Sequence, residues 1–219
     1  MSMEKLQENV FYKRYIYPNW ANIVSILGIL PLALLFLEDG YLYVIPLIIF
    51  NNVMDDLDGI LAAKLNIRSH VALVMAVGAH FGGVVLMASM VAATSTIIRA
   101  TSRVNPDATT GIGTPTNELM RHMLFVLLLA QIYNVDPGLY LVLTFILHAV
   151  TMVVPFTLTI LIRSLAKTAT AVTFVNISLV MAWLLPTVTP FIAAAFITTY
   201  LYSLTLGGSR WLREQKNKS

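Results

Sequence analysis

The chain has 219 residues, of which 58% are hydrophobic and only 11% are charged, and its mean hydropathy is +0.77. Soluble domains typically carry about 25% charged residues, so this composition excludes a water-facing globular protein and indicates an integral membrane protein. The absence of cysteine excludes disulfides and thiolate metal sites. The pI is about 9.2, but the basic residues lie between apolar runs, which indicates membrane topology rather than a nucleic-acid partner.

Six apolar segments follow one another along the chain, at 20–37, 41–64, 70–98, 118–134, 139–162 and 172–208. Because a spanning helix needs roughly 20 mostly apolar residues, we predict an all-α fold, a polytopic transmembrane helical bundle. The expected organisation is a cytoplasmic N-terminal segment at 1–15 without the pattern of a cleaved signal peptide, a membrane domain at 16–208, and a basic cytoplasmic tail at 209–219.

Two of these segments are long enough to raise the question of a second crossing. Gly78, Gly82 and Gly83 interrupt 70–98, and Pro186 and Pro190 lie within 172–208. Single crossings would give six membrane helices, and double crossings would give eight. At ~1.5 Å per residue, 70–98 spans about 43 Å, which is tight for two crossings of a core about 30 Å thick.

The distribution of basic residues favours eight crossings. The connections near 38–40, 134–138 and 186–190 contain no Lys or Arg. The positive-inside rule therefore places the N-terminus, 63–69, 99–117, 163–170 and the tail in the cytoplasm. For 63–69 and 99–117 to share a side, 70–98 must cross twice or re-enter. The expected location is an inner or plasma membrane, with any site near 63–69 facing the cytoplasm.

Three aspartates follow an apolar run: Asp55, Asp56 and Asp58. An ionisable residue inside a membrane costs ~2.5–3.5 kcal/mol, so three together require a physical explanation. On a helix, Asp55 and Asp58 share a face and Asp56 points about 100° away. Paired carboxylates at this spacing suit Mg²⁺, Mn²⁺ or Ca²⁺. The alternative is that the helix ends here and the aspartates lie in water at the interface.

The segment Asp55-x-x-Asp58-Gly59-x-x-Ala62 resembles the first half of the CDP-alcohol phosphatidyltransferase signature. Further similarities to this family are Pro18-Asn19 at the first apolar helix and Asn66-x-x-Ser69 between the two halves of the signature. Arg99-x-x-x-Arg103-x-Asn105 and Gly113-x-Pro115-Thr116 are similar, more weakly, to the phosphatidylserine synthase branch. The resemblance implies a helical membrane fold that transfers a phosphatidyl group from a CDP-linked lipid to a small hydroxyl acceptor and releases CMP.

The second half of the signature departs from the family at four positions, which hold Ala63, Ala72, Ala76 and His80. In the family, four aspartates bind two divalent metals that hold the CDP diphosphate, and the fourth acts as general base. With Ala76 and His80 in place of the last two, the resemblance implies a single Mg²⁺ or Mn²⁺ held by Asp55 and Asp58. His80 is then the candidate catalytic base, because a neutral imidazole accepts a proton near neutrality. A hydrogen-bonded core histidine is the alternative interpretation.

The remaining candidate residues are substrate-binding ones: Pro18, Asn19, Gly59, Ala62, Lys64, Arg68, Arg99 and Arg103. Topology alone also explains the four basic members of this set. Glu118 and Arg121, three residues apart on a predicted helix, are expected to pair. His148, a single polar group within an apolar run, is expected to bond to a neighbouring helix.

Two other classes of function stay open. One is a catalytically impaired member of the same family that binds lipid or nucleotide. The other is a small transporter in which Asp55, Asp58 and His80 relay protons or cations. A prenyltransferase is less favoured, because Asn51-Asn52-x-x-Asp55 superficially resembles its first motif but a second aspartate-rich motif is absent. The expected partners are a CDP-linked lipid, a small alcohol and membrane lipids, and a homodimer is left open.

Overall fold

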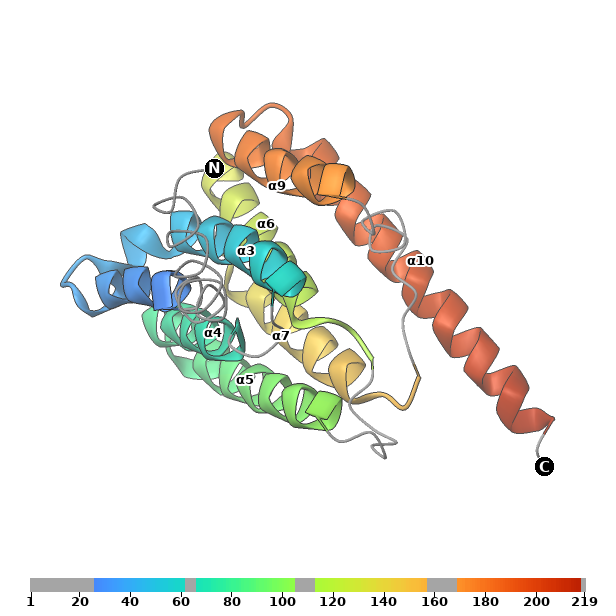
Figure 1. Ribbon diagram of the computed structural model, residues 1–219. Helices are drawn as coiled ribbons and strands as arrows, with labels where there is room; N and C mark the ends of the chain where they lie inside the picture. Colours follow the sequence, from blue (N-terminus) through green and yellow to red (C-terminus); the bar gives the residue numbers. More distant parts are fainter. Residues whose placement is uncertain (1–25, 62–65, 105–112, 157–168, 218–219) are drawn as a thin grey trace, which may run out of the picture.

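The computed structural model describes residues 26–61, 66–104, 113–156 and 169–217, without the side chains of 55–61, 66–67, 103–104 and 169–171. Every element in these ranges is helical, which confirms the all-α prediction (Figure 1). In chain order they are a helix at Ile26–Phe36 that ends as the 3₁₀ helix η3 (Leu30–Phe36), η4 (Gly40–Tyr43), α3 (Val44–Leu61), α4 (Asn66–Phe81), α5 (Gly83–Val104), α6 (Thr116–Tyr133), α7 (Gly138–Val153), α9 (Ala169–Leu184) and α10 (Thr189–Lys216).

The long segment 70–98 is a helical hairpin. Gly82 and Gly83 have φ values of 65° and 48°, a left-handed conformation that glycine adopts without a steric penalty, and the chain reverses direction there. A Cβ added at Gly78 would overlap the side chain of Ser89, so the absence of a side chain at Gly78 allows α4 and α5 to pack closely. Residues 66–69 and 99–102 therefore lie at the same end of the molecule.

The other long segment, 172–208, is also divided into two helices. α9 ends at Leu184 and α10 begins at Thr189, with Pro190 in its first turn, where proline is well tolerated. The Thr189 hydroxyl donates to the carbonyl of Ala182 at 2.6 Å and fastens the turn to the preceding helix. The turn has few polar side chains and lies beside the end of α6, where it forms a groove with Ile132 and Tyr133.

Two of the described helices are long and apolar enough to cross a membrane, Gly83–Ser102 and Thr189–Lys216. The shorter apolar helices are Ile26–Phe36, Gly40–Met54, Gly138–Val153 and Val172–Leu184. A helix of 16 residues is about 24 Å long, which is less than the ~30 Å hydrocarbon core. The structure thus bears out the all-helical fold, while the polytopic arrangement of six to eight crossings stays a prediction.

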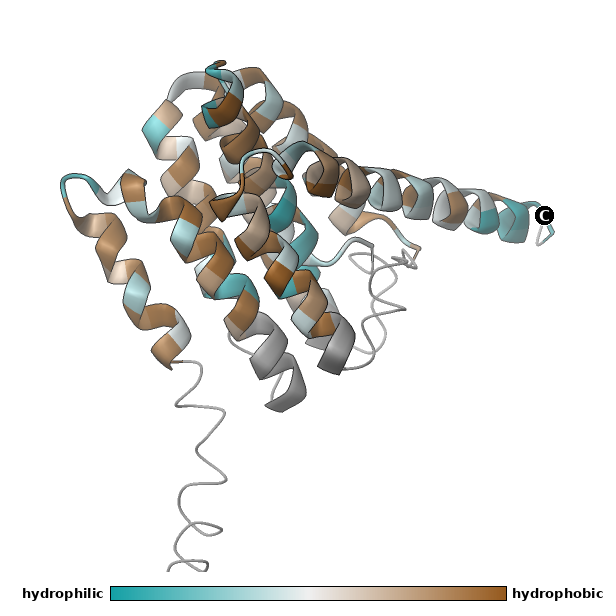
Figure 2. Ribbon diagram, turned by 90° about the horizontal axis from the view of Figure 1, so that it is seen from above, coloured by the Kyte–Doolittle hydropathy of each residue, from teal (hydrophilic) through white to brown (hydrophobic). Residues whose placement is uncertain are grey.

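The bundle is apolar both inside and outside. Ile48, Leu73, Leu119, Phe125 and Phe145 are completely buried at its centre. Large apolar side chains also cover the exterior, among them Val84, Met87 and Met90 on α5 and Leu139, Leu143 and Val150 on α7. Figure 2 shows hydrophobic residues along most of each helix and a hydrophilic stretch where α10 approaches the C-terminus.

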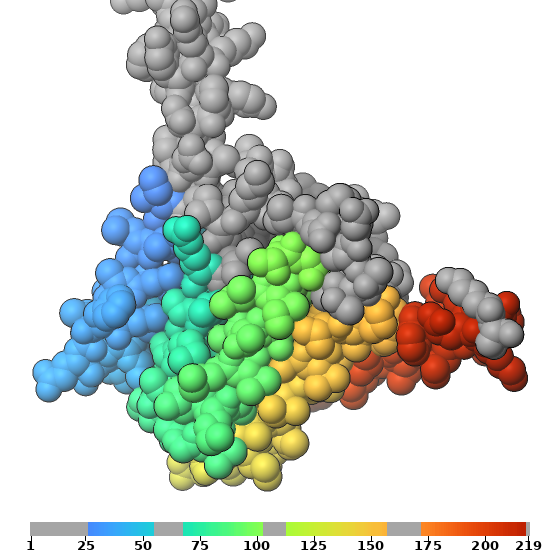
Figure 3. All heavy atoms as spheres, turned by 90° about the horizontal axis from the view of Figure 1, so that it is seen from below, coloured from blue at the N-terminus to red at the C-terminus, as the bar shows by residue number. Residues whose placement is uncertain are grey.

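The helices alternate in direction, so the bundle has two distinct ends. α5 and α7, which are separated by one helix in the chain, therefore run parallel and lie side by side (Figure 3). Thr96 of α5 contacts Met152 of α7, and both residues lie near the C-terminal ends of their helices. We call the end that holds the short connections 37–39, 82–83, 134–137 and 185–188 the turn end. The opposite end, where α3, α5 and α7 finish and α4, α6 and α9 begin, is called the polar end because buried polar side chains gather in its half of the bundle.

Candidate functional site

Two adjacent buried asparagines on α3 belong to the polar end. Asn51 and Asn52 are each only 1% exposed. The Asn52 amide nitrogen donates to the side-chain oxygen of Asn176 on α9 at 2.8 Å, and its oxygen accepts from Nε of Arg121 on α6 at 3.0 Å. Neither amide atom of Asn51 has a hydrogen-bond partner. Asn52 therefore joins three helices, while Asn51 has an unused donor and an unused acceptor inside the bundle.

The charged pair predicted on α6 is confirmed. Arg121 donates from Nη1 to Oε1 of Glu118 at 2.8 Å, and both residues are buried, at 8% and 3% exposure. The guanidinium also lies over the ring of Phe196 on α10, 5.9 Å from its centroid. The second carboxylate oxygen of Glu118, Oε2, is buried without a hydrogen-bond partner. This ion pair lies one helical turn from the start of α6 and is bridged to α3 by Asn52.

A second polar cluster connects α6, α7 and α10. Nδ1 of His122 and Nε2 of His148 lie 2.7 Å apart, which confirms that His148 bonds to a neighbouring helix. The Tyr200 ring packs against both imidazoles at 4.9 Å, and its hydroxyl lies 2.7 Å from that of Thr151. A hydrogen bond at this distance requires one imidazole nitrogen to donate and the other to accept, and the tautomers of the two rings determine which does which.

The segment at 113–115 closes this second cluster. The Thr114 backbone N–H donates to the carbonyl of Thr151 at 2.9 Å, and a Cβ at Gly113 would overlap that carbonyl. Arg99, 8% exposed, donates from Nε to the carbonyl of Thr114 at 3.1 Å. The resemblance grouped Arg99 with this Gly-x-Pro segment, and the structure brings the two into direct contact. Arg99 thereby acts at least as a positioning residue for the loop.

The expected metal ligands lie on α3, at the polar end. The backbone is helical through Asp55, Asp58 and Gly59, as the three-residue spacing requires, and Asn51 precedes Asp55 by one turn. Their side chains are outside the described ones, as are the side chain of Arg103 and the whole of Pro18, Asn19, Ala62 and Lys64. Arg68 is exposed near the start of α4, at the same end of the bundle. The predicted convergence of Asp55 and Asp58 on one cavity stays a prediction.

His80 does not lie at the aspartate end of α3. Its ring stacks on that of Tyr41, with centroids 3.5 Å apart and planes 2° apart, and it is exposed at the turn end. Tyr41 precedes α3, and the backbone from Val44 to Asp55 is roughly 16 Å long at ~1.5 Å per residue. Because α4 runs antiparallel to α3, its first residues rather than its last lie near Asp55. This position does not favour His80 as a base for a phosphate held at Asp58.

The single Mg²⁺ or Mn²⁺ expected at the polar end stays a prediction, because the side chains of Asp55 and Asp58 are outside the described ones. Carboxylates one turn apart on a helix offer the oxygen ligands that Mg²⁺ and Mn²⁺ prefer, and water and phosphate usually complete the Mg²⁺ shell. Asn51, one turn before Asp55, has a buried amide without a hydrogen-bond partner among the described residues. No group of three His, Cys, Asp or Glu side chains that could hold a metal occurs among the described residues.

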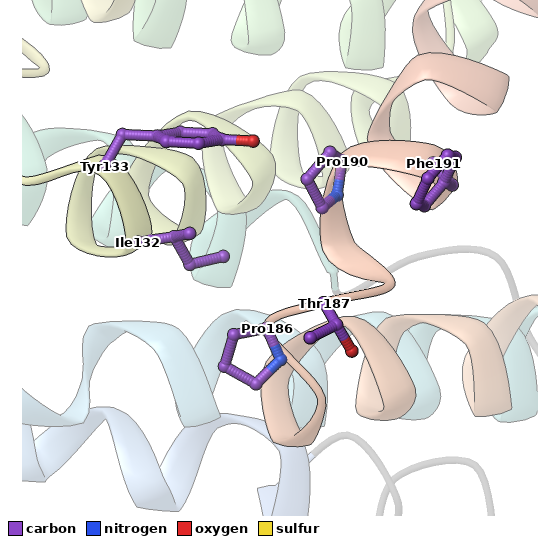
Figure 4. A pocket seen from close by; sticks show the side chains of 6 residues that line it. All are labelled: Ile132, Tyr133, Pro186, Thr187, Pro190 and Phe191. Carbon is purple, nitrogen blue, oxygen red and sulfur yellow. The ribbon is translucent and has the colours of Figure 1, made fainter.

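The turn end offers a different kind of surface. A groove of about 370 Å³ lies there between the end of α6 and the α9–α10 turn (Figure 4), lined by Ile132, Tyr133, Pro186, Thr187, Pro190 and Phe191. Only two of these side chains carry a polar group, a hydroxyl in each case, and none is charged. The groove therefore has no group that suits a phosphate or a metal, and the candidate site is the polar end.

Comparison with known proteins adds no assignment, since no family model, curated protein or solved structure matches the chain. The polar end therefore has to be interpreted from its own residues. Sequence reasoning did not single out Asn176, His122, Thr114 or Tyr200 as functional, and it considered Asn52 only within a less favoured prenyltransferase motif. Their only signal in the sequence is that each is a polar side chain within or beside an apolar run, which in membrane helices is costly and often functional.

Proposed function

We propose that this chain is a polytopic membrane protein with eight helical passes or re-entrant segments and with its polar end facing the cytoplasm. The four connections of the turn end contain no Lys or Arg, whereas Arg68 and Arg99 belong to the polar end. The glycine reversal at 82–83 supports the second pass that the positive-inside rule requires. The apolar side chains exposed along α5 and α7 suit lipid contact.

Single introduced cysteines test this topology cleanly, because the native chain has none. Val135→Cys, in the α6–α7 turn, should react with a membrane-impermeant maleimide from outside intact cells. Gln215→Cys, near the end of α10, should react only after the cells are opened. The proposed orientation fails if Val135→Cys is protected or if Gln215→Cys reacts from outside.

We further propose that the polar end binds a CDP-linked lipid through one Mg²⁺ or Mn²⁺. The observation that carries this is the buried network that joins Asn52 of α3, three residues before Asp55, to Arg121 and Glu118 of α6. Buried polar groups are expensive in a membrane and are commonly kept at ligand sites. When bound, a divalent ion would neutralise the diphosphate of the lipid.

The roles of the protein residues follow from their positions. Asp55 and Asp58 hold the ion, and Gly59 lets a substrate or neighbouring backbone approach closely. Asn52 joins Arg121 of α6 to Asn176 of α9, and this network keeps the interior polar beside the ion. Arg68 and Arg99, at the same end, are the candidates for attracting lipid phosphate.

The test is Mn²⁺ binding, measured by electron paramagnetic resonance on purified protein in nanodiscs, with and without CDP-diacylglycerol. Asp55→Asn and Asp58→Asn should each weaken Mn²⁺ binding and abolish its enhancement by the lipid. Asp56→Asn is the matched control, since its position is about 100° round the helix, and it should change binding little. Equal losses in all three variants, or no Mn²⁺ binding by the native chain, would overturn the proposal.

Transfer of the phosphatidyl group to a small hydroxyl acceptor is a second candidate function. The helical Asp55-x-x-Asp58-Gly59 segment, which the resemblance associates with this reaction, favours it. Metal-assisted positioning supplies much of the catalysis in phosphoryl transfer. CMP release from CDP-diacylglycerol in the presence of Mg²⁺ or Mn²⁺ tests it. Given its place at the turn end, His80→Ala should leave any such activity unchanged, whereas Asp58→Asn should abolish it.

A further inference from the structure

Asn51 and Asn52 form a natural pair for comparison, because they are adjacent, chemically identical and equally buried at 1% exposure. Both amide atoms of Asn52 are used, one by Asn176 and one by Arg121. Both amide atoms of Asn51 are without a partner. Since buried polar groups in folded proteins are nearly always hydrogen-bonded, the Asn51 amide requires an explanation.

The network that begins at the neighbouring Asn52 indicates what kind of partner would suit Asn51. Asn52 ties this layer of α3 to Arg121 and Glu118 on α6, and the charges of that pair cancel. The other oxygen of Glu118, Oε2, is buried at 3% exposure of the residue and can accept a further hydrogen bond. Asn51 and Glu118 thus offer one donor nitrogen and two acceptor oxygens, and the Glu118–Arg121 pair has no net charge for an ionic ligand.

We propose that Asn51 is a binding residue for an uncharged, multiply hydroxylated small molecule that enters the polar end. A hydroxyl both donates and accepts, so it satisfies the amide nitrogen and oxygen together, and a second hydroxyl donates to the Glu118 layer. An amino acid or a phosphorylated alcohol would bring a charge into a layer whose described charges are already paired. This inference rests on the proposed function, in which the molecule lies beside the bound lipid as its partner.

The experiment is a thermal-unfolding and calorimetric titration of full-length protein in nanodiscs, with and without Mg²⁺ and CDP-diacylglycerol. The probes are myo-inositol, L-serine and sn-glycerol 3-phosphate. Myo-inositol should raise the Tm of the native protein most. Asn51→Leu should raise the Tm without any probe, because it removes an unpaired amide, and should weaken myo-inositol binding by roughly tenfold or more.

Asn52→Leu is the matched control, and it should lower the Tm without any probe because it leaves Arg121 and Asn176 short of a partner. A merely structural Asn51 would behave in the same way: Asn51→Leu would lower the Tm and keep the response to myo-inositol. That result, no response of the native protein to myo-inositol, or a larger response to L-serine or glycerol 3-phosphate would overturn the inference. Should Asn51→Leu not fold, Asn51→Val is titrated instead.

Failure of the inference about Asn51 can be distinguished from failure of the proposed function. Binding of Mn²⁺ and CDP-diacylglycerol by the native chain tests the lipid site and does not involve Asn51. If the lipid and metal bind while myo-inositol does not, only the inference about Asn51 fails. If neither binds, the proposed function fails first.

Discussion

The two halves of the bundle use the same helices in different ways. At the polar end, α6 and α10 carry Arg121, His122 and Tyr200, whose side chains join four helices through ion-pair, imidazole and hydroxyl contacts. At the turn end, the same two helices present Tyr133 and Phe191 to an apolar groove (Figure 4). Buried polar groups cost free energy in a membrane, whereas an apolar groove does not. The contrast supports the choice of the polar end as the proposed functional site.

The largest expected effect comes from removing half of the buried ion pair. Arg121→Leu leaves the Glu118 carboxylate and the Asn52 oxygen without their partner, and it should cost about 3–5 kcal/mol in the free energy of unfolding. Equilibrium unfolding in mixed micelles measures this loss. Arg68→Leu, an exposed arginine at the same end, should change stability little.

A double variant distinguishes an unpaired charge from a general packing defect. Arg121→Leu combined with Glu118→Leu removes both charges and should recover much of the loss, because replacing a buried pair by apolar groups is often nearly neutral. Additive losses in the double variant would mean that packing, and not the orphaned carboxylate, explains the effect of Arg121→Leu.

The sequence predicted the elements well because local signals determine them. The reversal at Gly82–Gly83, the break near Pro186 and the Glu118–Arg121 pair all depend on residues close together in the chain. The Asn52–Asn176 bond joins residues that are 124 positions apart, and no local pattern encodes such a contact. It follows from how the helices pack.

The position of His80 shows the same limit. Helical periodicity correctly puts Ala76 and His80 on one side of α4, but it does not say how far α4 is shifted along α3. In the structure α4 begins at Asn66, and His80 lies about 21 Å further along it at ~1.5 Å per residue. The histidine therefore reaches Tyr41 at the turn end instead of the level of Asp58.

A second, smaller effect on the free energy of unfolding is expected from replacing one histidine at each end. His148→Leu breaks the 2.7 Å contact with His122 and leaves that imidazole buried without its partner. We expect a loss of about 1–2 kcal/mol in unfolding free energy. His80→Leu removes only a ring stack on an exposed residue and should cost less. Similar losses for both variants would contradict the proposed difference between the ends.

The turn at 82–83 provides a third test, which concerns the backbone alone. Gly82 has a φ of 65°, and an added Cβ meets nothing within 4 Å, so Gly82→Ala introduces strain without a clash. The expected cost is about 1–2 kcal/mol. Gly208→Ala is the control, because its Cβ would make ordinary contact with Phe156 at 3.8 Å. If Gly82→Ala is neutral, the hairpin does not depend on the left-handed glycine.

The smallest effect is expected in the groove of the turn end. Phe191 is 76% exposed, so Phe191→Ala opens no cavity and should change the free energy of unfolding by less than about 0.5 kcal/mol. Phe196 lies five residues further along the same helix but is 5% exposed, and it packs on Phe125 and beneath Arg121. Phe196→Ala should therefore cost several times more, both through the cavity and through the loss of the ring under the guanidinium. Unfolding of both variants in the same lipid mixture measures the ratio directly. A ratio near one would mean that the groove is as well packed as the polar end, and the functional contrast between the two ends would then lose its structural basis.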